Sequence, residues 1–135
     1  MTNPIETWLN FLKNPDSGTL DSILADEVEF HSPVVYKAQS GKNITSLYLQ
    51  AAISVLGNDT FRYVRKIIGE NDAVLEFIVT VDELEINGVD LIRWGADGKI
   101  TDFKVMIRPL KAVNKIHQLM AEKLMSTQKA MGRKD

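Results

Sequence analysis

Asp90 is the residue best suited to acid–base chemistry, and it falls within the strand-like segment 84–94. It shares strand parity with Ile92 and Trp94, so the three side chains are expected on one face of a sheet. A carboxyl group held against apolar walls has its charged form disfavoured, which raises its pKa. Such a group is a candidate general acid, general base or ligand anchor. The alternative is a strand-end carboxylate that caps Gly88 or faces solvent.

His31 is a second candidate for proton transfer, because the unperturbed pKa of histidine lies near neutral pH. It could pair with Asp90 or with Glu29. Its strand parity is opposite to that of Val28 and Phe30, which are expected to face the core. A place on the rim or at an interface is therefore the alternative for His31.

The sequence offers no recognisable set of metal ligands. The other histidine, His117, lies on a predicted helix beside Ile116 and is expected to be structural or exposed. Two distant histidines, no cysteine and no clustered carboxylates do not match the usual metal sites. We therefore expect neither a metal nor another cofactor.

Aromatic side chains with polar tips are the predicted ligand contacts. Trp8 and Tyr48 lie on apolar helix faces, where plain core packing is the alternative. With Asp90 across a pocket, their N–H and O–H groups could contact a ligand oxygen. Ser32 precedes Pro33 and could instead serve a turn. The predicted ligand-binding residues are Trp8, Ser32, Tyr48, Phe77, Ile92, Trp94 and Val105.

The composition narrows the class of protein. The chain has 135 residues, of which 44% are hydrophobic and 25% charged, as expected of one globular domain spanning 1–135. A net charge of −2 supplies no basic field for nucleic acid, and the absence of cysteine excludes disulfides. The sequence shows neither a signal peptide nor an apolar run of the roughly 18 residues that a membrane span needs. A soluble cytoplasmic protein is expected.

Three helices are predicted in the first half of the chain. Apolar residues at helical spacing indicate one between Pro4 and Asn14, a short one around Leu20, and a third from Ile44 to Val55. Thr19 or Ser17 could cap the short helix.

Strands dominate the second half. A short strand is predicted at 27–31, followed by long strands at 61–68, 73–81, 84–94 and 99–107. The chain turns at Asp82-Glu83 or at Asn87-Gly88; we favour the first, with Gly88 as a β-bulge. Pro109 opens a terminal helix at 110–131, whose apolar side could pack on the sheet, shield a dimer contact or close the pocket mouth.

Helices followed by a strand meander indicate an α+β fold. Several strands are apolar on both parities, as Leu75, Phe77 and Ile78 show. One face of a curved sheet would wrap the helices, and part of the other face must be covered too. This pattern predicts a homodimer through the outer sheet face.

Three segments resemble the nuclear transport factor 2-like superfamily, in its SnoaL-like and ketosteroid isomerase-like branch. They are Ala25–Val34, Gly88–Trp94 and Asp97–Ile100, and with the helix pattern the resemblance extends to about Pro109. It implies a cone-shaped, cystatin-like fold, in which a curved mixed or antiparallel sheet wraps around N-terminal helices and a helix follows at the C-terminus.

The steroid isomerases of this superfamily require a carboxylate base, a phenol and a protonated carboxylic acid. In ketosteroid isomerase, the last of these groups is a carboxylic acid that stays neutral at pH 7 and donates a hydrogen bond. The resemblance places the base position on Ser32, the phenol position on Trp8 and the acid position on Asp90. Asp90 alone keeps its chemistry, because serine needs its own base and an indole is a weaker acid than a phenol.

Two other activities of the superfamily are also incompletely matched. The polyketide cyclases use an acid on the last strand, a position that falls on Val105, with Asp102 on the opposite parity. The small epoxide hydrolases need an arginine between two aspartates, typically in an Arg-x-Asp on a strand, and none of the predicted strands carries one.

The sequence thus supports two hypotheses. The first is a protein that binds an apolar, oxygenated small molecule through Asp90, with isomerase-, cyclase- or hydratase-type proton transfer if it is an enzyme. The second is a non-catalytic homodimeric binding or assembly module.

Overall fold

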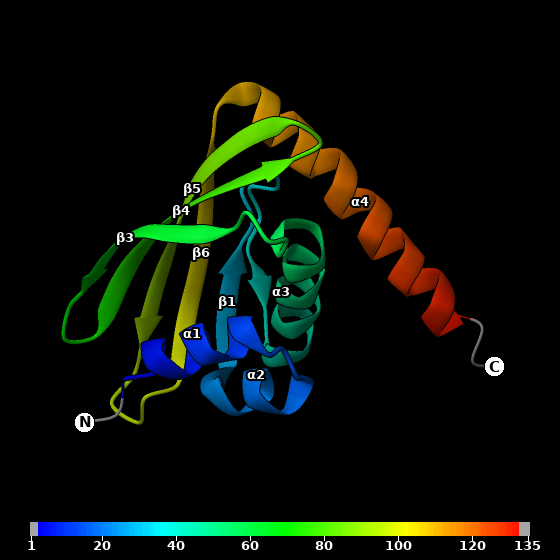
Figure 1. The fold of residues 1–135 in the computed structure, drawn as a ribbon. Coiled ribbons are helices and arrows are strands. Elements are labelled where there is room, and N and C mark those ends of the chain that lie inside the picture. The colour runs from blue at the N-terminus through cyan, green and yellow to red at the C-terminus, as the bar shows by residue number, and fades with distance from the viewer. Residues whose placement is uncertain (1–2, 133–135) are drawn as a thin grey trace.

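The computed structural model describes residues 3–132, which form four helices and six strands in α+β order (Figure 1). In chain order they are α1 (Ile5–Lys13), α2 (Ser17–Ile23), β1 (Leu24–His31), β2 (Gln39–Ser40), α3 (Lys42–Leu56), β3 (Arg62–Ile68), β4 (Asp72–Val81), β5 (Leu84–Trp94), β6 (Ile100–Arg108) and α4 (Leu110–Gly132). The predicted fold class and terminal helix are confirmed. Within these residues, no helix is long and apolar enough to cross a membrane.

The six strands form one curved sheet in the order β2-β1-β6-β5-β4-β3. β1 and β6 run parallel, and all other neighbours are antiparallel. Helices α1, α2 and α3 lie in the hollow of the sheet (Figure 1). The sheet is therefore mixed, with a concave face that packs against helices and a convex outer face.

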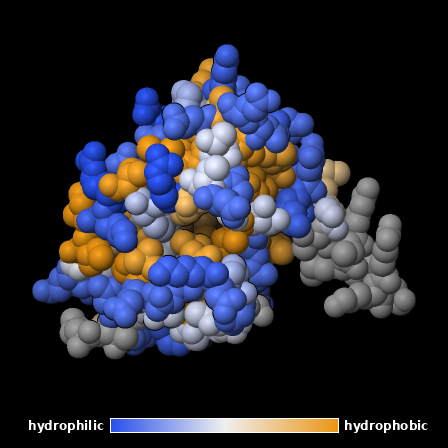
Figure 2. All heavy atoms as spheres, viewed as in Figure 1, coloured by the Kyte–Doolittle hydropathy of each residue, from blue (hydrophilic) through white to orange (hydrophobic). Residues whose placement is uncertain are grey.

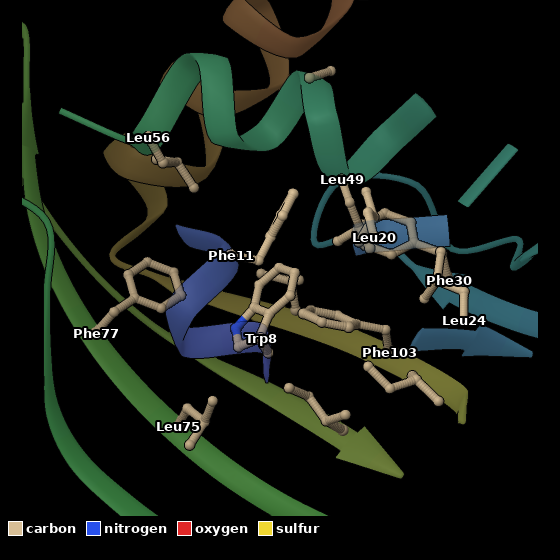
Figure 3. Close-up of a cluster of buried hydrophobic side chains, with 14 of the residues drawn as sticks. Trp8, Phe11, Leu20, Leu24, Phe30, Leu49, Leu56, Leu75, Phe77 and Phe103 are labelled. Carbon is tan, nitrogen blue, oxygen red and sulfur yellow. The ribbon is translucent and has the colours of Figure 1, made fainter. Parts of the chain in front are cut away.

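Strict alternation of apolar residues selects the concave face. Along β4, Ala73, Leu75, Phe77, Val79 and Val81 are buried, while the residues between them are partly exposed. Successive side chains of a strand point to opposite sides, so this single stripe faces the helices. Trp8 and Phe11 of α1 meet the sheet in an aromatic core that includes Phe77 and Phe103 (Figure 3).

The turn between β4 and β5 lies at Asp82-Glu83, as favoured from the sequence. Both residues have positive φ angles, 50° and 67°, as a two-residue hairpin turn requires. The predicted bulge at Gly88 is wrong, because Gly88 pairs in regular register with Phe77 on one side and Ile107 on the other. The irregularity of β5 occurs instead between Arg93 and Trp94.

Gly88 has a steric role in place of the predicted bulge. A Cβ atom there would collide with the Phe77 ring and lie 2.8 Å from the carbonyl oxygen of Met106. The missing side chain lets Phe77 lie directly over β5, which is one reason for glycine inside a strand.

Three local features differ from the sequence expectations. Asp16, rather than Ser17 or Thr19, caps α2, because its carboxylate accepts a 2.7 Å hydrogen bond from the Thr19 N–H. β1 begins at Leu24, directly after α2, and a short strand β2 pairs with it at Glu29 and Phe30.

The terminal helix α4 packs on α3 and β6 through Ala112, Ile116 and Met120 (Figure 1). Of the three roles considered for it, packing on its own domain is the one observed. No described residue of α4 lines the large cavity discussed below.

We predict that Gly88→Ala lowers the free energy of unfolding by about 1–3 kcal/mol, because the new methyl group overpacks the Phe77 contact. Urea denaturation measures the loss. Gly95→Ala is the matched control, since the nearest atom to its Cβ is 3.4 Å away. Adding Phe77→Ala should reduce the loss caused by Gly88→Ala and leave the part that comes from the Met106 carbonyl oxygen. Equal losses at positions 88 and 95 would contradict this account.

Candidate functional site

A cavity of about 560 Å³ lies between α1, α3 and the concave face of the sheet. Its walls are mostly apolar and come from all three of these layers, and they include Leu9, Leu12, Leu49, Ile53, Leu56 and Phe61. Figure 2 shows a hollow on this side of the molecule, with hydrophobic residues in its interior and hydrophilic residues around it. The size is that of pockets that hold drug-sized ligands.

A chain of two hydrogen bonds crosses the inner wall of this cavity. The Trp8 indole Nε1–H donates to the Tyr63 hydroxyl oxygen at 3.0 Å, and the Tyr63 hydroxyl donates to Asp90 Oδ2 at 2.6 Å. The second carboxyl oxygen, Asp90 Oδ1, accepts no hydrogen bond from residues 3–132. The cavity therefore has one polar anchor with an acceptor that protein groups leave open.

Strand parity places Asp90 in the wall. It lies on the same face of β5 as the buried residues Gly88 and Ile92. On the neighbouring strands it pairs with Leu75 of β4 and Val105 of β6. The other buried residues on its side of β4, β5 and β6 are apolar apart from Gly88, and Asp90 is only 6% exposed. The predicted inward orientation of Asp90 is thus present, and the capping and solvent-facing alternatives are not.

A β-bulge places Tyr63 beside Asp90. Arg65 pairs with Glu76 in the same register as the rest of the hairpin, but Tyr63 pairs with Phe77 instead of Ile78. Val64 is the extra residue, and it turns Tyr63 to the concave side. Regular alternation through this strand would have turned Tyr63 outwards and Val64 inwards.

Sequence reasoning missed Tyr63, although it identified the strand. The resemblance places the phenol position on Trp8 of α1, whereas in the structure Trp8 donates a hydrogen bond to a phenol on β3. The available signal was the hairpin register: counting back from the turn at Gly69 brings Tyr63 opposite Phe77 or Ile78. Only the bulge decides between the two.

Burial governs the ionisation of this pair. Removal from water raises the pKa of Asp90 to about 7, although the hydrogen bond from Tyr63 acts in the opposite direction by favouring the charged form. The pKa of Tyr63 is raised well above its usual range, first by burial and then by the charge of Asp90. Tyr63 therefore remains a hydrogen-bond donor, while Asp90 can donate or accept a proton near neutral pH.

Four of the predicted site residues line the cavity: Trp8, Phe77, Asp90 and Val105. Five others, His31, Ser32, Tyr48, Ile92 and Trp94, lie elsewhere, and their placement corrects the predicted pocket. Ser32 Oγ accepts hydrogen bonds from the N–H groups of Val34 and Val35 at 3.0 and 3.3 Å, which is the turn alternative.

Tyr48, Ile92 and Trp94 pack into the core outside the cavity wall. The Tyr48 ring lies 5.6 Å from the Phe30 ring, on the β1 side of α3, so its hydroxyl does not reach Asp90 across the cavity. Ile92 and Trp94 are buried further along β5, which borders the cavity only at Asp90. Strand parity therefore predicted which face of β5 these residues share, but not which of them reach the cavity.

His31 pairs with neither of the predicted carboxylates. Its Nε2 lies 2.9 Å from Asp102 Oδ1, because parallel pairing of β1 with β6 brings the two strands together. Glu29 lies near them, and one ligand atom from each residue falls within 4.8 Å of the others. The expectation that no such cluster forms is wrong, because Asp102 joins Glu29 and His31 only through this non-local pairing.

We predict that stability falls as pH rises from about 4 to about 7 through the ionisation of Asp90, by roughly 4 kcal/mol. The unfolded chain loses this proton near its ordinary pKa, whereas the folded chain retains it until about 7, so the folded state binds more protons in this window. Urea unfolding across this range should show a flatter profile for Asp90→Asn. Identical profiles for both proteins would refute the burial account.

The comparisons with known proteins agree with this architecture. The family model of the SnoaL-like domain matches residues 5–103. A steroid delta-isomerase structure from Pseudomonas aeruginosa is similar at 31% identity and a TM-score of 0.87, covering 93% of this chain and 91% of that one. No curated protein matches the chain.

Two further structures show the same fold. An uncharacterised protein with a cystatin-like fold from Silicibacter pomeroyi is 30% identical, with a TM-score of 0.87 over 98% of this chain and 92% of that one. A nuclear transport factor 2-like protein of unknown function from Cytophaga hutchinsonii is 17% identical, with a TM-score of 0.58 over 81% and 93%, and supports the fold alone. From the matched domain and these likenesses, the chain belongs to the SnoaL-like domain family of the nuclear transport factor 2-like superfamily.

Proposed function

We propose that this chain binds an apolar small molecule that carries an oxygen atom, in the cavity between α1, α3 and the sheet. The observation that carries the proposal is the open acceptor Asp90 Oδ1 in an otherwise apolar wall. Asp90 Oδ1 is accessible rather than enclosed by protein atoms, so a ligand group that donates a hydrogen bond to it gains affinity. Trp8, Phe77 and Val105 would contact the apolar body of the ligand.

The bond between Asp90 and the ligand depends on the ionisation of the carboxyl group. With a pKa of about 7, Asp90 is protonated at mildly acidic pH and can donate a hydrogen bond to a carbonyl oxygen. Above that pH it is an acceptor for a hydroxyl group or an acidic C–H. Tyr63 holds the carboxyl in place through Oδ2 in both states.

Proton transfer of the isomerase, cyclase or hydratase type is the chemistry that this group would support. The likeness to a steroid delta-isomerase favours the isomerase form. Asp90 is the single carboxylate in the cavity wall among the described residues, and the Ser32 hydroxyl is engaged in its turn. Asp90 would therefore remove the proton and return it, without a second base.

We expect Asp90→Leu to weaken the binding of a steroidal enone about tenfold, because one buried hydrogen bond is lost. Isothermal titration calorimetry below pH 7 measures the affinity. Asp102→Leu is the matched control, since Asp102 bonds to His31 outside the cavity. Wild-type affinity in Asp90→Leu would refute the binding site. Asp90→Asn cannot ionise, so this variant separates turnover of a β,γ-unsaturated ketone from binding of the ligand.

The outer sheet face supports a second role, as a homodimer contact. Ile67 and Met106 are 57% and 51% exposed, and the cross-strand pairs Ile67–Val74 and Val89–Met106 lie on this same side. Apolar side chains gathered on an exposed face typically mark a protein interface.

We predict that Met106→Glu shifts the wild-type dimer to monomer, because a charge would be buried in the contact. Sedimentation equilibrium measures the molecular mass. Met125→Glu on α4 is the control, since that methionine is 58% exposed away from the sheet. A monomeric wild-type protein, or equal dimerisation of both variants, would rule out this interface.

A further inference from the structure

Three cationic residues belong to the lining of the cavity; the side chain of Lys66 leaves β3 on the concave side, and that of Arg62 leaves it on the convex side at the edge of the sheet. Lys13 lies at the last turn of α1, and Arg62 and Lys66 lie on β3; all three are exposed and belong to the cavity lining. We refer to them as the rim cations. Asp90 is the one acidic residue in the lining of the described chain, and it lies at the inner wall.

None of the rim cations has a protein partner among the described residues. Arg65, on the same strand, forms an ion pair with Glu76 at 3.1 Å, and Lys115 forms one with Asp82 at 2.8 Å. By contrast, no residue in 3–132 forms an ion pair or side-chain hydrogen bond with Lys13, Arg62 or Lys66. The positive charge at the cavity is therefore uncompensated by the chain itself.

The bulge at Val64 contributes to this arrangement. Tyr63 and Lys66 are three residues apart, so regular alternation would place them on opposite faces of the strand. With one extra residue between them, Tyr63 pairs with Phe77 and Lys66 pairs with Leu75, both on the concave side. Tyr63 and Lys66 of the same strand thus border one cavity. Apolar residues such as Leu12 and Phe61 line the same cavity.

We propose that the ligand of this cavity is an amphipathic anion. Its oxygen would bond to Asp90, its apolar body would fill the cavity, and a carboxylate or phosphate ester would lie among the rim cations. This inference rests on the proposed binding function and adds the charge of the ligand. Opposite charges at an exposed rim attract over a distance of roughly 10 Å at moderate salt, so affinity should depend on ionic strength.

A matched pair of ligands tests the role of the charge. The probe is a medium-chain fatty acid with a ketone at the end away from its carboxylate, and its methyl ester serves as the neutral counterpart. We expect the acid to bind about tenfold more tightly than the ester at low salt, because three cations act on one anion. A phosphate monoester of the same oxo chain shows which of the two anions is preferred.

The variant Lys13→Gln/Arg62→Gln/Lys66→Gln should abolish this preference and leave binding of the ester unchanged. The control Lys37→Gln/Lys99→Gln/Lys111→Gln changes the net charge equally at exposed sites outside the cavity and should retain the preference. Equal affinity for both anions and the ester, with the ester still weakened by Asp90→Leu, would overturn this inference alone. If neither Asp90→Leu nor the rim variant changes binding of any probe, the proposed function falls with it.

Discussion

The hydrogen bond from the Tyr63 hydroxyl to Asp90 Oδ2 is the interaction on which the site depends. A carboxyl group in an apolar wall loses its hydration, and its ionised form becomes costly unless a donor is supplied. Tyr63 supplies that donor at 2.6 Å, and Trp8 supports the phenol from the opposite side with its indole N–H. Helix α1 and two strands are therefore tied to one acid through two bonds.

This arrangement keeps the acid both buried and titratable. Burial raises the pKa of Asp90, while the bond from Tyr63 limits the rise, and the result is a value of about 7. The pKa of Tyr63 is also raised, which moves it further above neutral pH. The phenol therefore keeps its proton while Asp90 titrates. Two adjacent ionisable groups thus have separate roles, a condition that acid–base sites generally meet.

Local patterns in the sequence predicted much of this architecture. Helical spacing located α1, α3 and α4, strand alternation located β3 to β6, and parity alone turned Asp90 towards the core. The parts that failed depend on non-local geometry. The bulge in β3 decides where Tyr63 points, the parallel pairing of β1 with β6 brings His31 to Asp102, and curvature decides that Asp90 reaches the cavity while Trp94 does not.

Strand β3 has only one neighbour in the sheet, so its first residues are bonded on one side alone. Sliding the short section before Val64 by one residue would remove the bulge and pair Val64 with Phe77. An isopropyl group would then replace the phenol in the cavity, and Asp90 would lose its donor while every residue of the site remained in the chain. The proton affinity of one buried carboxyl group is thus a reporter of how the edge of the sheet is paired.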